Sequence, residues 1–334
     1  MYKESMRQTW VEIDLSALDH NIKEIKRVVG NNEIIGVVKA DAYGHGSVRC
    51  AKVLRDNGVR RFAVATIEEA LELREAGFDE SILILGLVPE DCTDIIIEQD
   101  LTIVVGSLDR AKKKSEIAVN KGAIIDCFIA IDSGMGRIGY RIETPLEKEF
   151  ARTEIEEIDE LEGLRINGMV SHFATSDEAD STYTNKQLSL FNDFYEELAG
   201  CGINVPMLCI ANSAAIMNYP KTHFDAVRPG IILYGCYPSE EVDKMRLDLK
   251  PVMSVKAYII HIKTVPAGTS ISYGRKFVSE RESKIATISI GYADGYSRTL
   301  TGKAEVLVHG HRVPVVGSIC MDQCMIDVTD VPDR

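Results

Sequence analysis

The stretch IIGVVKADAYGHG, residues 34–46, joins an apolar, β-branched run to a lysine and then to small and polar residues. Short runs of the same kind recur along the first two thirds of the chain. They are apolar almost throughout, as strands covered on both faces should be, rather than alternating in polarity. Eight such runs occur, at residues 34–40, 61–65, 82–86, 102–106, 123–131, 166–172, 207–211 and 224–228.

Helix signals lie between these runs. In TIEEALELREAG, residues 66–77, Thr66 and Glu69 form a capping-box pattern and Gly77 supplies a stop. Eight alternating strand and helix units within about 240 residues favour an α/β fold with one closed (βα)8 TIM barrel over an open sheet.

The character of the sequence changes after residue 240. Stretches such as PVMSVKAYIIHIKTVPAG and AEVLVHGHRVPVVG are strand runs broken by Gly and Pro turns, with no long amphipathic helix between them. The sequence therefore predicts a barrel at residues 1–240 followed by a C-terminal mostly-β domain at residues 241–334. Residues 1–14, which contain the run WVEIDL, are a candidate to pair with that β domain.

Composition limits the partners of the chain. Its net charge of -13 over 334 residues argues against a surface that binds nucleic acid or anionic lipid. No stretch approaches the roughly 20 apolar residues of a membrane helix, and the N-terminus lacks the apolar core of a signal peptide. We therefore expect a cytoplasmic protein with no nucleic acid and no membrane partner.

The eight cysteines are scattered and lie mostly within apolar runs, which favours reduced thiols that pack as small hydrophobes. Cys320 and Cys324 are the one close pair, and no histidine or second cysteine pair accompanies them. We therefore expect no metal site.

Active sites of (βα)8 barrels lie at the carboxyl ends of the strands, so the residues that follow each run are the candidates. Taken singly, each has an ordinary explanation, since a strand-end lysine is usually solvated and a lone histidine is usually structural. Taken together, they would meet at one mouth of the barrel, which favours a site. These residues are Lys39, Asp132, Arg137, His172, Asn212, Ser213, Arg228 and Gly230.

The loops after the last two strands are a recurrent phosphate-binding place in this fold. Here they read ANSAA and RPGI, and they offer an amide, a hydroxyl and backbone N–H groups. A lysine across the mouth from a phosphate site is the arrangement expected of a Schiff-base lysine that holds pyridoxal 5'-phosphate (PLP).

The stretch GMGRIG, residues 134–139, matches the dinucleotide-binding pattern G-x-G-x-x-G. In that motif a helix must begin within the glycines. Here the next helix is predicted to begin at Pro145, with Thr144 as its N-cap and Glu147 completing a capping box. A dinucleotide site is therefore disfavoured.

The motifs resemble those of the alanine racemases along nearly the whole chain and in the same order. They are GVVKADAYGHG, FAVATIEEALELREAG, IDSGMGRIG, SHFATSDE, ANSAA, VRPGIILYG, LKPVMSVKA, VPAGTSISYG, ISIGYADGY and VPVVGSICMDQCMIDV. The resemblance implies a PLP enzyme that interconverts L- and D-alanine and supplies D-alanine for peptidoglycan. It also implies a head-to-tail homodimer in which the β domain of one subunit completes the active site of the other.

The resemblance assigns roles to individual residues. It implies that Lys39 carries the cofactor and is one of two proton-transfer groups, and that Tyr273 of the other subunit is the second. Arg228 would face the pyridine nitrogen, with His172 beside it. The further cofactor contacts would be Tyr43, Asn212, Ser213, Gly230 and Ile231. Arg137 and the backbone of Met321 would bind the substrate carboxylate. Tyr292 and Asp322 would line an entrance that favours small substrates.

The chain departs from the family pattern in two places. Many members carry a carbamylated lysine that aligns the arginine, where this chain has Ala130, so we expect an anion such as chloride, or another side chain, to replace it beside Arg137. Members also usually continue through several more strands, one of which brings a further tyrosine to the phosphate, so the β domain is expected to be shortened.

Three other functions stay open. A serine or broad-specificity racemase would use the same site residues. A PLP decarboxylase of the same fold would place an acidic residue at the pyridine nitrogen, where this chain offers Arg228. A PLP carrier without a reaction would have no need of Tyr273.

Overall fold

The structure is a computed structural model that describes residues 8–332. The chain divides into two units, a barrel unit of residues 13–252 and a β unit of residues 8–12 and 253–332. The expected TIM barrel followed by a mostly-β domain is confirmed.

A parallel sheet forms the centre of the barrel unit, in the order β10-β2-β3-β4-β5-β6-β8-β9. The ring closes where the backbone N–H of Arg228 donates to the carbonyl of Ala211 at 2.9 Å. Each of the eight predicted runs overlaps a strand of this path. The strands are β2 (Glu33–Val37), β3 (Arg61–Val64), β4 (Ser81–Ile84), β5 (Leu101–Val105), β6 (Ile125–Asp132), β8 (Leu164–Val170), β9 (Leu208–Cys209) and β10 (Ala226–Val227), and the short β7 (Tyr140–Arg141) pairs with β6.

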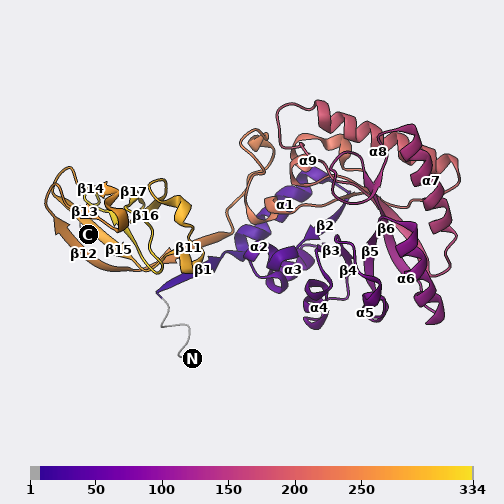
Figure 1. The fold of residues 1–334 in the computed structure, drawn as a ribbon, viewed down its shortest axis with the longest axis horizontal. Helices are drawn as coiled ribbons and strands as arrows, with labels where there is room; N and C mark the ends of the chain where they lie inside the picture. Colours follow the sequence, from indigo (N-terminus) through magenta and orange to yellow (C-terminus); the bar gives the residue numbers. More distant parts are fainter. Residues whose placement is uncertain (1–7, 333–334) are drawn as a thin grey trace. The chain divides into compact units, whose positions relative to one another are not determined.

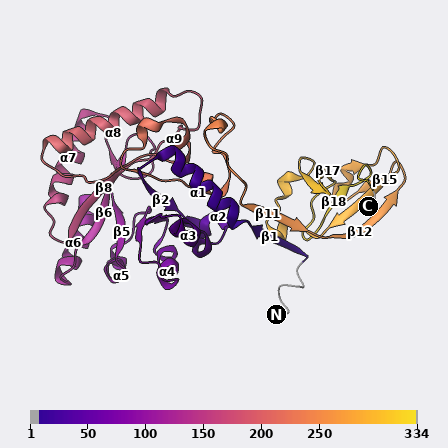
Figure 2. The same cartoon turned by 180° about the vertical axis from the view of Figure 1, so that it is seen from behind.

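Helices cover the outside of this ring, as both views in Figures 1 and 2 show for the barrel unit. The α-helices of this unit are α1 (Leu15–Val29), α2 (Lys39–Gly44), α3 (Ser47–Asp56), α4 (Ile67–Glu75), α5 (Thr93–Glu98), α6 (Leu108–Asn120), α7 (Pro145–Asp159), α8 (Thr182–Gly200) and α9 (Ser213–Asn218), of which α2 and α9 lie at the carboxyl ends of the strands. The capping box of Thr144 and Glu147 is present, and α7 begins at Pro145 as predicted. The glycines of GMGRIG therefore lie in a loop and open no helix.

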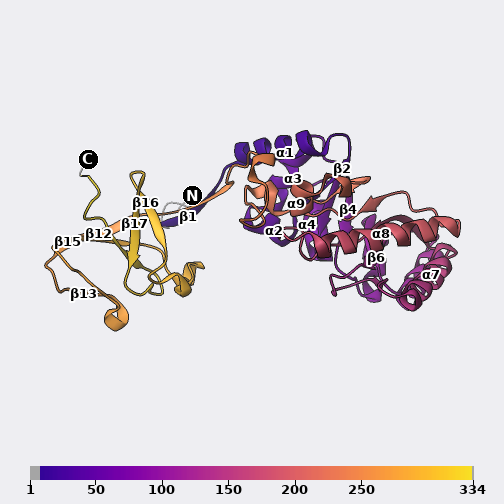
Figure 3. The same cartoon turned by 90° about the horizontal axis from the view of Figure 1, so that it is seen from above.

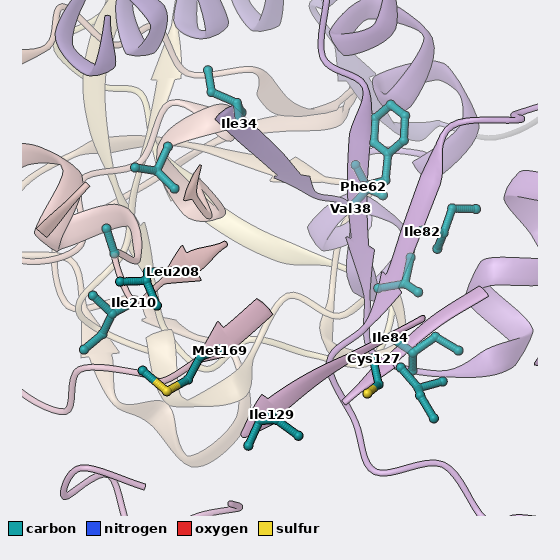
Figure 4. Packing of buried hydrophobic residues seen from close by; sticks show 14 of the residues in the cluster. Ile34, Val38, Phe62, Ile82, Ile84, Cys127, Ile129, Met169, Leu208 and Ile210 are labelled. Atoms are coloured by element: carbon teal, nitrogen blue, oxygen red, sulfur yellow. The ribbon is translucent and has the colours of Figure 1, made fainter. Parts of the chain in front are cut away.

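Side chains alternate between the two faces of each barrel strand. One set points outward and packs against the helices; Figure 4 shows Ile34, Phe62, Ile82, Ile129 and Met169 from this set. The intervening set fills the barrel interior, and its members are Ile35, Val37, Ala63, Leu83, Val104, Phe128, Ala130, Val170, Cys209 and Ala226. Burial of both sets explains why the strand runs are apolar throughout.

The β unit holds a five-stranded antiparallel sheet in the order β12-β15-β18-β17-β16, and Figure 3 shows β16 beside β17. Two short pairs, β1 with β11 and β13 with β14, accompany it. The strands are β1 (Thr9–Ile13), β11 (Met253–Ala257), β12 (Ile259–Val265), β13 (Ser270–Ile271), β14 (Phe277–Val278), β15 (Ser283–Ile288), β16 (Glu305–Val308), β17 (His311–Val316) and β18 (Cys324–Asp327).

The division between the units falls at Val252/Met253, later than the expected residue 240. Residues before this division pack on α1, where the buried Asn21 amide donates to the carbonyls of Leu233 and Lys250 at 3.0 and 2.8 Å. The Lys250 N–H returns a hydrogen bond to Asn21 Oδ1 at 2.8 Å. These contacts hold the segment to the barrel.

None of the helices within residues 8–332 combines the length and the apolar character needed to cross a membrane.

Gly168 of β8 provides space for a large side chain in the barrel interior. A Cβ at this position would lie 2.4 Å from Cε1 of Phe128 and 2.6 Å from the carbonyl oxygen of Met207. No real Cβ contact is that short, so even one methyl group would force the interior of the barrel to shift.

We therefore expect Gly168→Ala to lower the free energy of unfolding by about 1–3 kcal/mol, measured by urea denaturation. Gly200→Ala is the matched control, because a Cβ there would meet nothing within 4 Å. This control should be neutral or stabilising by less than about 1 kcal/mol. Equal stability of the two variants would contradict the packing described here.

Candidate active site

A cavity of about 600 Å³ opens at the carboxyl ends of the barrel strands. Asp132 is not part of its wall. The wall contains the other barrel residues that the sequence analysis selected. These are Lys39, Tyr43, Arg137, His172, Asn212, Ser213, Arg228, Gly230 and Ile231. The structure therefore brings together nine residues that follow five different strands, β2, β6, β8, β9 and β10.

Lys39 lies two residues after the end of β2 and is half-buried in the cavity wall. Burial is the main cause that lowers the pKa of its amine, and the cations of Arg137 and Arg228 lower it further. The carboxylate of Glu69 opposes these effects. A lowered pKa leaves more of the amine unprotonated at neutral pH, and the unprotonated amine is the form that can bond to an aldehyde or accept a proton.

The four residues after Lys39 form a left-handed turn within α2. Ala40, Asp41, Ala42 and Tyr43 have φ between 51° and 56°, although none is glycine. For an L-residue this conformation costs about 1–2 kcal/mol each, so surrounding contacts must hold it.

Two kinds of contact hold the turn in place. The carboxylate of Asp41 accepts the backbone N–H of Ser47 at 2.7 Å. The rings of Tyr43 and His45 both lie against Tyr234, with centroids 5.0 and 4.6 Å away. The turn thus fixes both Lys39 and Tyr43 at the cavity.

Arg228 is buried beneath the cavity and is held by neutral acceptors. Its Nη1 donates to the carbonyl of Cys209 at 2.7 Å, and its Nη2 donates to the carbonyl of Ser171 at 2.6 Å. Within residues 8–332 it forms no ion pair with a carboxylate. It therefore places an uncompensated positive charge at the bottom of the cavity.

His172 lies beside this guanidinium, with its Nδ1 3.3 Å from Nη2 of Arg228. Because an arginine can only donate, Nδ1 must act as the acceptor and the ring proton belongs on Nε2. Burial, and then the charges of Arg228, Arg137 and Lys39, lower the pKa of His172 to about 3. The imidazole is therefore neutral at physiological pH.

The two loops after β9 and β10 meet at Gly230. Its backbone N–H donates to the hydroxyl of Ser213 at 3.0 Å, and a Cβ at Gly230 would lie 2.6 Å from the hydroxyl of Tyr43. In the described part of the chain, the Tyr43 hydroxyl forms no hydrogen bond. Glycine therefore lets the Tyr43 hydroxyl approach the backbone closely, and the hydroxyl groups of Tyr43 and Ser213 gathered here suit the oxygens of a phosphate.

Asn212 shapes the first of these loops. Its Oδ1 accepts the backbone N–H of Ala215 at 3.0 Å and the hydroxyl of Ser176 at 2.9 Å. The oxygen is thus occupied within the protein.

Arg137 projects from the glycine-rich loop after β6. The carboxylate of Asp132 shapes this loop by accepting the N–H groups of Gly134 and Gly136 at 3.0 and 2.9 Å. Arg137 itself is exposed at the cavity and forms no ion pair with any residue from 8 to 332. Ala130 lies buried in the cavity wall near the base of the loop and offers no charge. The guanidinium is therefore available to an anion.

The other four selected residues, Tyr273, Tyr292, Met321 and Asp322, belong to the β unit. The segment 318–322 brings them together there. The Ser318 hydroxyl donates to the carbonyl of Tyr273 at 2.9 Å, the N–H of Tyr292 donates to the carbonyl of Cys320 at 3.1 Å, and Met321 and Asp322 follow in the chain. The Tyr273 side chain is 70% exposed, so its hydroxyl is accessible to a partner or a ligand.

The sequence analysis missed one residue at the site. Glu69 was assigned only to the cap of α4, yet its carboxylate also accepts the backbone N–H of Ala40, the residue after Lys39, at 2.7 Å. Its place shortly after β3 was the available signal, because strand ends of a barrel share one rim.

Comparison with known proteins agrees with the motif resemblance. Residues 13–238 match the family described as "Alanine racemase, N-terminal domain", and residues 252–334 match "Alanine racemase, C-terminal domain". The chain is 51% identical over 327 residues to alanine racemase 1 of Clostridium acetobutylicum, covering 98% of this chain and 83% of that protein.

Solved structures agree as well. The alanine racemase of Clostridium difficile 630 superposes with a TM-score of 0.91 at 42% identity, over 98% of this chain and 85% of that one. The alanine racemase of a D-cycloserine-producing Streptomyces lavendulae superposes with a TM-score of 0.92 at 33% identity, over 99% of this chain and 86% of that one. With both of its parts matched and with relatives this similar along its length, the chain belongs to the alanine racemase family.

Proposed function

We propose that this protein interconverts L- and D-alanine with PLP as its cofactor, and thereby supplies D-alanine for peptidoglycan. The observation that carries the proposal is the cavity itself. Its wall holds a half-buried lysine of lowered pKa together with Gly230 and the hydroxyl groups of Tyr43 and Ser213, which suit a phosphate. Curated relatives that carry the name alanine racemase support the choice of substrate.

The residues of the cavity fit this cofactor. Lys39 would bond to its aldehyde carbon, and Tyr43, Ser213, Gly230 and Ile231 would surround its phosphate, with Asn212 shaping the loop. When bound, PLP acts as an electron sink that makes the α-hydrogen of an amino acid acidic.

Arg228 would act at the ring nitrogen of the cofactor. A guanidinium does not release its proton at any physiological pH, so it can donate a hydrogen bond to that nitrogen without protonating it. The electron sink is then weaker than it would be opposite a carboxylate, which disfavours decarboxylation and side reactions. The neutral His172 would orient the guanidinium through Nδ1.

Racemisation needs a proton-transfer group on each face of the substrate α-carbon, because the proton leaves one face and returns to the other. Lys39 would serve one face, since its lowered pKa makes the amine available. The exposed hydroxyl of Tyr273, contributed by a second subunit, would serve the other. A PLP carrier would have no use for this second group.

The substrate would be held by its carboxylate. Arg137 has no anionic partner among the described residues and would bind that carboxylate together with the backbone of Met321 from the second subunit. A chloride ion, or a similar anion, would sit beside Arg137 in place of the carbamylated lysine that many members have where this chain has Ala130. Tyr292 and Asp322 would line the entrance and favour a small side chain.

A racemase assay with L-alanine and pure holoenzyme tests the proposed activity. We expect Lys39→Ala to reduce the rate of D-alanine formation by about 10²- to 10⁴-fold, because both the cofactor bond and one proton-transfer group are lost. Lys52→Ala, which removes an exposed lysine of α3, is the matched control and should leave the rate unchanged. Undiminished racemisation by the Lys39 variant would refute the proposal.

Substrate preference separates an alanine racemase from a serine or broad-specificity racemase. We expect kcat/KM for L-alanine to exceed the values for L-serine and L-lysine. Tyr292→Ala should raise the relative value for L-serine by up to about 10-fold, because it widens the entrance. A wild-type preference for serine or lysine would favour the alternative enzyme.

A mixing experiment tests whether two subunits share each site in a head-to-tail homodimer. Lys39→Ala and Tyr273→Phe should each be nearly inactive alone. Exchange of subunits makes hybrid dimers in which one site carries both changes and the other none, so activity should return to about one quarter of wild type. No recovery, once mass spectrometry has verified that hybrids form, would place both groups in one chain.

A further inference from the structure

Glu69 occupies the third position of α4, where a capping box would direct its carboxylate to the backbone of Thr66. The first half of that box is present, because the hydroxyl of Thr66 accepts the N–H of Glu69 at 3.4 Å. The second half is replaced by other partners. Glu69 Oε2 accepts the N–H of Ala65, and Glu69 Oε1 accepts the N–H of Ala40, both at 2.7 Å.

One carboxylate therefore bridges the ends of two neighbouring barrel strands. Ala65 directly follows β3, and Ala40 lies just beyond β2 in the first turn of α2. N–H groups in the first turn of a helix have no carbonyl partner within it, so they depend on acceptors from outside. A hydrogen bond from an N–H to a carboxylate is shorter and stronger than one between neutral groups.

The bridge acts at the residue that decides where Lys39 points. Ala40 begins the left-handed run, with φ 51° and ψ 51°, and it is joined directly to Lys39. If the N–H of Ala40 lost its acceptor, the chain there could relax toward negative φ, which L-residues prefer. The Lys39 side chain would then swing relative to the rest of the cavity.

We propose that Glu69 is a positioning residue, whose carboxylate fixes the left-handed turn after Lys39 and so holds the lysine amine in place for its work. The inference rests on the proposed function of Lys39. Glu69 is not among the residues that line the cavity, and its carboxylate acts on Lys39 through the backbone of Ala40 and through its negative charge.

Three variants of the full-length holoenzyme test this inference. Glu69→Gln keeps the shape but turns an amide N–H toward one of the two backbone N–H groups. Glu69→Asp keeps the charge but is too short to span both. Glu72→Gln is the matched control, since it removes the same charge from an exposed position one turn along the same helix.

Amide hydrogen exchange provides a readout that does not depend on activity. We expect Ala40 and Ala65 to lose protection in both Glu69 variants and to keep it in the control. With L-alanine, kcat should fall by about 10- to 100-fold in Glu69→Gln while KM stays within about twofold, because the lysine is misplaced and Arg137 is not. The circular dichroism that the protein induces in bound PLP should weaken in parallel.

Wild-type kcat and dichroism in Glu69→Gln would overturn the inference, and so would equal losses in Glu72→Gln. If Glu69→Gln does not fold, the same outcomes in Glu69→Asp decide the matter. If the wild-type protein has no racemase activity, the proposed function is refuted. The hydrogen exchange of Ala40 would still show whether Glu69 holds the turn, so the two failures can be told apart.

Discussion

The parallel register between the first and last barrel strands is the constraint on which the site depends. β2 pairs with β10 so that Ile34 lies opposite Val227, and the N–H of Val37 donates to the carbonyl of Pro229 at 3.1 Å. Lys39 follows β2 by two residues, and Gly230 follows Pro229 by one. Closure of the barrel therefore brings Lys39 and Gly230 to one rim, although almost 200 residues separate them in the chain. Slippage of this register by one residue would turn each side chain to the opposite face of the strand.

Charge gives the cavity its chemical character. The chain as a whole carries a net charge of -13, yet the cavity collects the cations of Lys39, Arg137 and Arg228. Burial and these three charges keep His172 neutral. Burial and the charges of Arg137 and Arg228 lower the pKa of Lys39, while Glu69 partly offsets this effect. A pocket of this kind suits a ligand with two anionic ends, such as a phosphate on one side and a carboxylate on the other.

The sequence predicted the features that follow from local rules. Strands buried on both faces must be apolar throughout, so all eight barrel strands were recognisable, and the start of α7 followed from Thr144, Pro145 and Glu147. Features that depend on distant contacts were not predictable. The left-handed turn at Ala40 consists of residues that avoid positive φ, and the second partner of Glu69 lies 29 positions away in the chain.

The account depends most on the bond between Lys39 and the cofactor. Reduction of the PLP-loaded protein with borohydride, followed by digestion and peptide mass spectrometry, locates that bond directly. The account predicts a pyridoxyl label on Lys39 and on no other lysine. A label on a different lysine, or no label in a chain that binds PLP, would contradict it.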